Sequence, residues 1–352
     1  MSIVTRSFGK TSKGEEVTLY SLENKNGMKA ELIDFGAILV NLFTPDKEGK
    51  MDDIVLGYDN IKSYEELNTP GFGSFIGRHA NRIGGAKFVL NGAVYELEKN
   101  DGNNNLHGGT PGYNKVMYQA ETASEPGKDS ITFSRISPDM EQGFPGNFEM
   151  KMTYELTDKN ELVLIYEGVS DKDTLVNLTN HTYFNLAGHA SGSILDHKVK
   201  IQAKQFTPTS DDLIPQGERM NVVGTPMDFT VSKRIGDEIE ADFKPLVIAG
   251  GYDHNYVLDR EDDGQVVYVG ELVEEKSGRK MEIATDLVGM QFYTGNFIMD
   301  EDGKNGAHYI KRDGVCFETQ FFPNSCNVES FKSCVLKAGE KFKSTTVYTF
   351  YA

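Results

Sequence analysis

The chain has 352 residues, of which 38% are hydrophobic and 11% aromatic, enough to fill a large core. It carries 53 acidic against 36 basic residues, and the resulting net charge of −17 disfavours nucleic acid and anionic membranes as partners. The N-terminus has no apolar signal-peptide core, and no stretch of 18 apolar residues follows, so we expect a cytoplasmic protein without a membrane-spanning helix. Three cysteines without a CxxC pair predict free thiols in a reducing compartment: Cys316, Cys326 and Cys334.

Short runs of alternating apolar and polar residues, separated by turns, extend along the chain. The clearest hairpins join residues 152–156 to 162–166 and residues 267–274 to 281–283. Similar patterns predict further strands at residues 29–43, 87–90, 130–135, 199–203 and 345–351.

Helical patterns are confined to residues 60–67 and 231–240, both too short to cover a parallel sheet. No linker or repeat of fixed period divides the chain. We therefore predict one all-β domain over residues 1–352, a large antiparallel β-sandwich whose loops and concave face hold the chemistry.

Two of the seven histidines lie in unusual surroundings. His107 ends a polar stretch that begins at Asp101 and is followed by Gly108-Gly109, which predicts a loop. His181 lies in a segment, residues 177–186, whose alternate residues carry hydrogen-bonding groups. Taken singly, either histidine could also be an ordinary surface or core residue.

Carboxylates supply the complementary chemistry. Glu318 has apolar and aromatic neighbours, so partial desolvation should raise its pKa towards that of a useful base, although a solvent-facing acid at a strand edge fits the same pattern. Asp253 follows Gly250-Gly251 and Tyr252, a mixture that suits a sugar but also an ordinary turn. Arg78 and Arg82, four residues apart, could be structural ion-pair partners in so acidic a chain.

Spacing typical of metal and nucleotide sites is missing from the sequence. HxH, HExxH and EF-hand patterns do not occur, and Asp253 and His254 are adjacent and would point to opposite faces of a strand. Glycine-rich nucleotide loops are also missing. We expect neither a metal nor a cofactor.

Together, the segments resemble the aldose 1-epimerase (galactose mutarotase) family, in the family's order and over most of the chain. The matching segments are Ile33-Asp34-Phe35-Gly36-Ala37, Asp53-Ile54-Val55-Leu56-Gly57-Tyr58, Gly77-Arg78-His79-Ala80-Asn81-Arg82-Ile83, Asn105-Leu106-His107-Gly108-Gly109, Asn180-His181-Thr182-Tyr183-Phe184-Asn185-Leu186, Gly251-Tyr252-Asp253-His254-Asn255, Gln291-Phe292-Tyr293-Thr294-Gly295-Asn296 and Glu318-Thr319-Gln320-Phe321-Phe322-Pro323. The resemblance implies the supersandwich form of the antiparallel β-sandwich, and an enzyme, an isomerase, that interconverts the α and β anomers of free hexoses such as glucose and galactose.

The resemblance also implies roles for particular residues. Glu318 would be the general base at the C1 hydroxyl and His181 the general acid at the ring oxygen, with nearby carboxylates raising the fraction of charged His181. The remaining substrate-binding residues would be Asn81, Arg82, His107, Tyr183, Asp253 and Gln291. Arg78 would be structural, and His79 departs from the apolar residue expected there, which places a third imidazole close to the site.

Three alternatives remain open at the level of sequence. A hexose-6-phosphate 1-epimerase would share the mechanism but needs extra cationic residues, and a glycoside hydrolase would pair Glu318 with Asp253. A non-catalytic sugar-binding module would tolerate the loss of Glu318. The partner is expected to be a small hexose, and the protein a monomer or homodimer.

Overall fold

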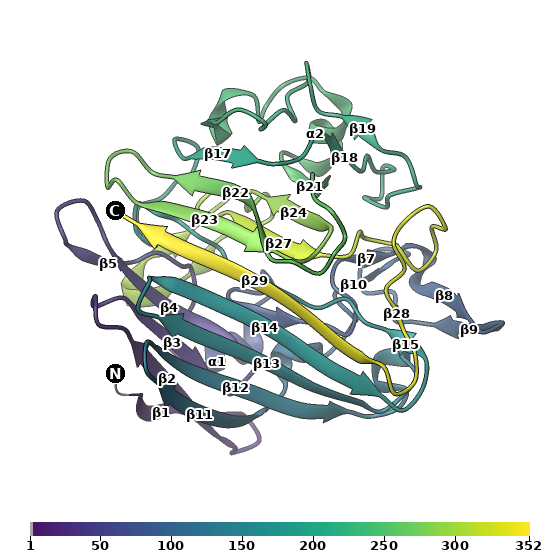
Figure 1. Ribbon diagram of the computed structural model, residues 1–352, viewed down its shortest axis with the longest axis horizontal. Helices are drawn as coiled ribbons and strands as arrows, with labels where there is room; N and C mark the ends of the chain where they lie inside the picture. Colours follow the sequence, from purple (N-terminus) through teal and green to yellow (C-terminus); the bar gives the residue numbers. More distant parts are fainter. Residues whose placement is uncertain (1–2) are drawn as a thin grey trace.

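The computed structural model describes residues 3–352, and antiparallel strands dominate it (Figure 1). A nine-stranded sheet contains β11 (Gln119–Glu125), β12 (Lys128–Ser137), β13 (Phe148–Thr157), β14 (Glu161–Ser170), β29 (Lys341–Tyr351), β23 (Lys280–Thr285), β22 (Val267–Val273), β17 (Lys198–Ile201) and β20 (Lys233–Arg234), in that order. One five-stranded sheet contains β1 (Val4–Lys10), β2 (Glu16–Glu23), β3 (Lys29–Ile33), β4 (Ile38–Pro45) and β5 (Met51–Asp53). The other contains β19 (Met220–Asn221), β18 (Gln205–Phe206), β21 (Asp253–Val257), β24 (Gly289–Tyr293) and β27 (Cys316–Gln320).

Two-stranded pairs and short helices complete the structure. The pairs are β6 (Ser74–Ile76) with β16 (Thr179–His181), β7 (Arg82–Ile83) with β10 (Asn105–Leu106), β8 (Lys87–Leu90) with β9 (Ala93–Glu96), β15 (Thr174–Leu175) with β28 (Val335–Leu336), and β25 (Glu301–Asp302) with β26 (His308–Tyr309). The helices are α1 (Ile61–Glu66), α2 (Lys244–Ala249) and the single 3₁₀ turns Gly84–Ala86, Tyr113–Lys115, Glu141–Gly143, Ile235–Asp237 and Lys304–Gly306. None of the helices in residues 3–352 is long and apolar enough to cross a bilayer.

The main core lies between the nine-stranded sheet and the two smaller sheets. The inward-facing residues of β13 alternate with exposed ones, as period-2 patterning requires, and Phe133 of β12 meets Tyr20 of β2 edge to face. On the other half of the sheet, the hydroxyl of Tyr348 in β29 donates a hydrogen bond to the carbonyl of Phe317 in β27. The predicted large antiparallel β-sandwich is confirmed.

Strand β27 is buried on both faces, and this determines the surroundings of the site. Phe317 and Thr319 face the nine-stranded sheet, where the hydroxyls of Thr319 and Thr346 bond each other at 2.5 Å. By alternation, Cys316, Glu318 and Gln320 project from the opposite face. Every polar side chain on that face is therefore removed from bulk water.

Most predicted strands coincide with observed ones, but the segment 29–43 is two strands rather than one. β3 and β4 pair with each other through a turn at residues 34–37, where Gly36 and Ala37 have φ values of 67° and 47°. A Cβ atom on Gly36 would lie 2.5 Å from the carbonyl oxygen of Asn114, so glycine is needed there. The continuous apolar pattern conceals this reversal.

The predicted helix at 60–67 is present as α1, capped by the side chain of Asn60, whereas the one at 231–240 is wrong. That segment forms β20 and a 3₁₀ turn, because Gly236 packs directly against Leu195 and only Ile235 and Ile239 are buried. The second α-helix follows it, with proline in its first turn and Gly250 at its C-terminus in the left-handed conformation.

Candidate active site

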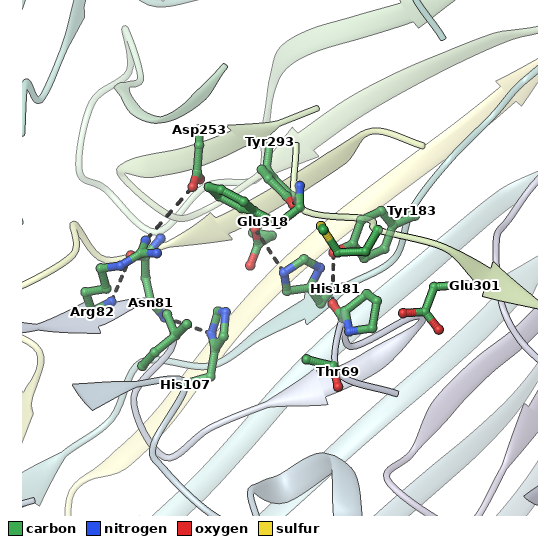
Figure 2. A pocket seen from close by; sticks show the side chains of 14 residues that line it. Thr69, Asn81, Arg82, His107, His181, Tyr183, Asp253, Tyr293, Glu301 and Glu318 are labelled. Carbon is green, nitrogen blue, oxygen red and sulfur yellow. Dashed lines mark hydrogen bonds and ion pairs between the residues drawn. The ribbon is translucent and has the colours of Figure 1, made fainter. Parts of the chain in front are cut away.

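A cavity of about 370 Å³ opens where β16, β21, β27 and the loops around β7 and β10 meet (Figure 2). This size is within the range for small-molecule sites. Its walls are mixed, with aromatic and aliphatic surfaces beside a few convergent polar groups. The lining residues are Thr69, Pro70, Asn81, Arg82, Leu106, His107, His181, Tyr183, Asp253, Tyr293, Phe297, Met299, Glu301 and Glu318.

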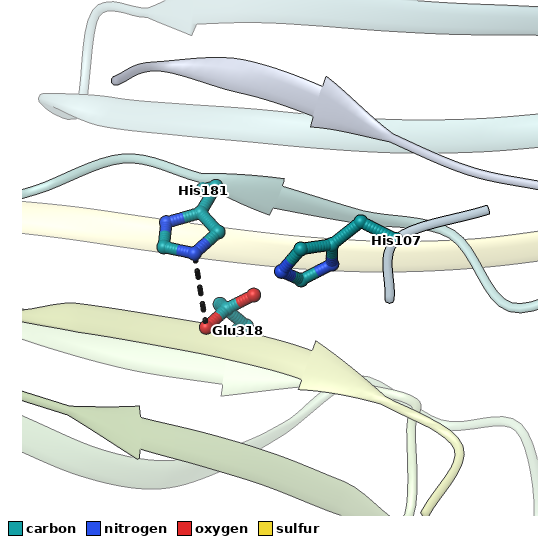
Figure 3. A group of neighbouring side chains, drawn as sticks. All are labelled: His107, His181 and Glu318. Carbon is teal, nitrogen blue, oxygen red and sulfur yellow. Dashed lines mark ion pairs between the residues drawn. The ribbon is translucent and has the colours of Figure 1, made fainter. Parts of the chain in front are cut away.

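His181 and Glu318 face each other in the middle of this cavity (Figures 2 and 3). Nε2 of His181 lies 3.8 Å from Oε1 of Glu318. His181 ends β16 and Glu318 is central in β27, two strands that pack together in the structure. The fold thus brings together the two residues that the sequence suggested as an acid–base pair.

Glu318 is almost completely buried, at 2% exposure, and its Oε2 atom forms no hydrogen bond. Burial raises its pKa well above the ordinary value, and the nearby carboxylate of Asp253 raises it further, while Arg82 acts in the opposite direction. A buried carboxylate without partners is a strong proton acceptor for any group that enters the cavity.

His181 is held between aromatic rings. Its imidazole stacks on Tyr183 with ring centroids 5.0 Å apart and lies edge-on to Tyr293, while its Nδ1 is 3.5 Å from the thiol of Cys316. Burial lowers the pKa of His181 to about 4. This contradicts the expectation that nearby carboxylates raise the charged fraction, because desolvation by burial dominates the shift. The neutral thiol at Nδ1 is also a weak acceptor for an imidazolium.

His107 is fixed in one orientation by the backbone of Asn81. The amide of Asn81 donates to Nδ1 of His107 at 3.1 Å, and the amide of His107 donates to the carbonyl of Asn81. Both residues have positive φ, at 61° and 54°. Because Nδ1 accepts, the proton of the neutral ring is on Nε2. His107 therefore presents an N–H donor to the cavity.

Arg82 and Asp253 form the opposite wall. Nε of Arg82 donates to Asp101 at 2.7 Å, and its Nη1 lies 4.0 Å from Asp253. Burial raises the pKa of Asp253, partly offset by Arg82 and by a hydrogen bond from Nε2 of Gln291 at 2.6 Å. Gln291 is buried and does not line the cavity, so its side chain reaches the site only through Asp253.

Neither Arg78 nor His79 lines the cavity. The guanidinium of Arg78 is fully buried and donates to backbone carbonyls of Ser137, Pro145 and Gly146 and to nearby hydroxyls, an arrangement that supports the loops behind the site. His79 is also fully buried, and neither ring nitrogen forms a hydrogen bond. Burial lowers the pKa of His79 to about 4.

His107, His181 and Glu318 have the spacing of a metal site, with ligand atoms within 4.8 Å of one another (Figure 3). The hydrogen bonding of His107 opposes this use. A ligating imidazole normally donates its other N–H to an acceptor, whereas Nδ1 of His107 accepts from the Asn81 amide and Nε2 carries the proton. The donor set fits a hydrogen-bonded organic ligand better than a cation.

Several lining residues were not predicted from the sequence. Tyr293 lies two positions after Gln291 on β24, so alternation could have placed it on the same face. Phe297, Met299 and Glu301 come from the following segment, and nothing in their local sequence indicates a cavity. Cys316, which contacts His181 but does not line the cavity, lies two positions before Glu318 and could have been found in the same way as Tyr293.

Comparison with known proteins identifies the family of the chain. The model of the aldose 1-epimerase family matches residues 18–349. The chain is 40% identical to a galactose mutarotase from Sus scrofa over 99% of both chains, and 33% identical to an aldose 1-epimerase from Escherichia coli K12 over 96% of both. It also resembles the crystal structure of an aldose epimerase homologue from C. elegans, with a TM-score of 0.86 and 30% identity, over 95% of this chain and 98% of that one. The chain therefore belongs to the aldose 1-epimerase family.

Proposed function

We propose that this protein is an aldose 1-epimerase that interconverts the α and β anomers of free hexoses, with Glu318 as general base and His181 as general acid. The observation that carries the proposal is the buried pair itself, with Nε2 and Oε1 3.8 Å apart at the wall of a sugar-sized cavity. Family membership supports the same activity.

The reaction needs one proton removed and one supplied. Glu318 takes the proton from the C1 hydroxyl while His181 gives a proton to the ring oxygen, and the C1–O5 bond breaks. C1 becomes a planar aldehyde, rotation about C1–C2 exposes its other face, and reclosure returns both protons. Each transfer contributes roughly 10²- to 10⁴-fold, so the two together supply about 5 to 11 kcal/mol when independent.

The buried surroundings favour the chemistry in a specific way. The carboxylate–imidazolium pair that begins ring opening and the carboxylic acid–imidazole pair that follows it contain the same number of protons. Burial raises the pKa of Glu318 and lowers that of His181, so it disfavours the charged pair relative to the neutral one. The forward transfer thereby starts from a strong base and a strong acid.

The other residues bind the sugar. The Nε2–H of His107 donates to an oxygen near the reacting centre, Asp253 and Arg82 bind hydroxyls at the far side together with Asn81, and Gln291 supports Asp253. The ring of Tyr183, whose hydroxyl is tied to the carbonyl of Pro70, offers an apolar surface.

Charge in the cavity favours a free hexose over a phosphorylated one. Arg82 is the single arginine or lysine among the lining residues, and Asp101 and Asp253 already compensate it. The other acidic or basic lining residues are Asp253, Glu301, Glu318, His107 and His181, so no second lysine or arginine lines the cavity to bind a phosphate dianion. A glycoside hydrolase fits less well, because an imidazole rather than a second carboxyl faces Glu318.

Polarimetry on freshly dissolved α-D-glucose and α-D-galactose tests the proposal. Wild type should accelerate the approach to equilibrium, and the folded Glu318→Gln variant should not. No acceleration by wild type would end the mutarotase assignment, and equal acceleration by the variant would remove Glu318 as base. Faster turnover of α-D-glucose 6-phosphate than of glucose, or release of p-nitrophenol from an aryl galactoside, would favour the respective alternative.

We also propose that the protein is cytoplasmic and forms one domain, as a monomer or homodimer. The three cysteines are free thiols, two of them buried, which suits a reducing compartment.

A further inference from the structure

Behind the cavity wall, the amide side chains of Asn255, Gln291 and Gln320 lie on one face of three adjacent strands. Asn255, Gln291 and Glu318 are cross-strand partners on β21, β24 and β27. Gln320 follows Glu318 by two residues and therefore shares its face. It is fully buried and does not touch the cavity.

The hydrogen bonds among these groups run in one direction. Nε2 of Gln320 donates to Oε1 of Gln291 at 3.3 Å, and Nε2 of Gln291 donates to Oδ1 of Asp253 at 2.6 Å. Each step connects residues that are diagonal neighbours in the sheet, since Gln291 opposes Glu318 and Asn255 rather than Gln320 and Asp253. An amide can satisfy both contacts only with its NH₂ towards the carboxylate and its oxygen towards Gln320.

A contact with Asn255 fixes the orientation of the Gln320 amide. Its Nε2 also lies 3.4 Å from Oδ1 of Asn255, whose NH₂ group faces the hydroxyl of Thr207 at 3.5 Å. The side chain of Asn255 occupies the space above Gly289, where an added Cβ atom would lie 2.6 Å from Oδ1. Oε1 of Gln291 and Oδ1 of Asn255 therefore both accept from the NH₂ group of Gln320.

The oxygen of Gln320 forms no hydrogen bond although it is buried. An unsatisfied buried acceptor costs about 1–3 kcal/mol, which offsets part of what the two hydrogen bonds from the NH₂ group of Gln320 contribute to the fold. Stability alone thus explains the amide only in part, and its NH₂ group is directed at the support of a binding residue.

We propose that Gln320 is a positioning residue that fixes the amide of Gln291, and through it the carboxylate of Asp253, for binding sugar hydroxyls. Gln291 occupies Oδ1 of Asp253, which leaves Oδ2 on the side of Arg82 for the substrate. This inference rests on the proposed function, in which Asp253 binds the sugar and Glu318 and His181 carry out the proton transfers.

The test is a double-mutant cycle with Gln320→Leu, Gln291→Leu and the double variant, and Gln119→Leu on the exposed strand β11 as matched control. Each variant is assayed by polarimetry for kcat and KM and by thermal unfolding for integrity. Gln320→Leu should raise KM on the order of tenfold, as expected for weakening a hydrogen bond to a charged group, with kcat within about threefold and the fold retained. In the Gln291→Leu background, Gln320→Leu should add no further rise in KM.

Additive effects of the two substitutions on KM, or an unchanged KM in a folded Gln320→Leu variant, would overturn the inference while leaving the mutarotase assignment in place. A wild-type protein without mutarotase activity would instead refute the proposed function. Should Gln320→Leu not fold, Gln320→Met preserves length without the NH₂ group and is expected to give the same rise in KM.

Discussion

Nε2 of His181 and Oε1 of Glu318 lie 3.8 Å apart, beyond hydrogen-bonding distance, so neither atom is used up by the other. Oε2 of Glu318 has no partner either. A buried acid and a buried base that do not satisfy each other cost stability, and a polar ligand that enters the cavity can satisfy both. This relationship leads to the first prediction.

Glu318→Gln should lower activity without lowering stability. The amide has the same shape but cannot accept the C1 proton, so kcat should fall by roughly 10²- to 10⁴-fold. Because the substitution removes a desolvated, unpaired carboxyl, Tm should stay the same or rise. Polarimetry and calorimetry on the same preparation measure both.

The gain in stability should depend on pH with a definite sign. Burial raises the pKa of Glu318 in the folded state, so the folded protein binds more protons than the unfolded chain above the ordinary carboxyl pKa of 4.5. Wild-type stability therefore decreases as pH rises through this range, and the difference in Tm between Glu318→Gln and wild type should widen from pH 5 to pH 8. A difference that narrows instead would contradict the buried, unpaired state of this carboxyl.

Replacing His79 by leucine should protect the fold against acid. Its pKa is about 4 in the folded protein against 6.5 ordinarily, so the unfolded chain binds more protons between these values. The stability contributed by neutral His79 is complete above pH 6.5 and is lost as pH falls towards 4, by about 3 kcal/mol for a shift of this size. His79→Leu should remove that loss.

Thermal unfolding at pH 7, 6 and 5 measures the effect. The Tm of His79→Leu should exceed that of wild type increasingly as pH falls. Activity at pH 7 should be unchanged, because His79 does not line the cavity. A parallel fall in both proteins would show that His79 is not buried and unpaired.

Arg78 and Arg82 should respond differently to the same conservative change. Lysine cannot reproduce the hydrogen bonds that the buried Arg78 makes to three carbonyls, so Arg78→Lys should lower the free energy of unfolding by about 3–5 kcal/mol. The folded fraction should keep its kcat/KM. Arg82→Lys should cost less stability but raise KM, because the bond from Nε to Asp101 orients its charge beside Asp253. Urea unfolding and polarimetry distinguish the two outcomes, and a rise in KM for Arg78→Lys would assign Arg78 to the site.

The strands that form hairpins were predictable because their evidence is local. In β13 and β14, alternation and a turn of Asp158, Lys159 and Asn160 lie within one short segment. The reversal between β3 and β4 and the failed helix at 231–240 depend instead on distant contacts, of Gly36 with Asn114 and of Gly236 with Leu195. Neither partner can be identified from one sequence.

For the site, too, some features could be predicted from the sequence and others could not. The residue types of His181, Glu318, His107 and Asp253 suggested chemistry, and the structure places all four at one cavity. Their ionisation could not be foreseen, because it depends on how fully β27 is covered, and burial reversed the expected shift of the His181 pKa. Phe297 and Met299 line the cavity only because their segment folds back over it.

The dependence of kcat/KM on pH tests the acid–base pair as a unit. The active form contains one proton shared between Glu318 and His181, so activity should fall when a second proton binds and when the only proton is lost. Because burial lowers the pKa of His181 to about 4 and raises that of Glu318, the acid limb should appear near pH 4 and the alkaline limb well above the ordinary carboxyl pKa. Stopped-flow polarimetry between pH 3.5 and 10, with circular dichroism to verify folding at each pH, measures both limbs.

Cys316→Ser provides an internal check: a hydroxyl accepts more strongly from Nδ1 than the thiol does, so the substitution should raise the pKa of His181 and move the acid limb to higher pH. A rate that is constant over the whole range, or an acid limb unaffected by Cys316→Ser, would remove His181 from the role of general acid.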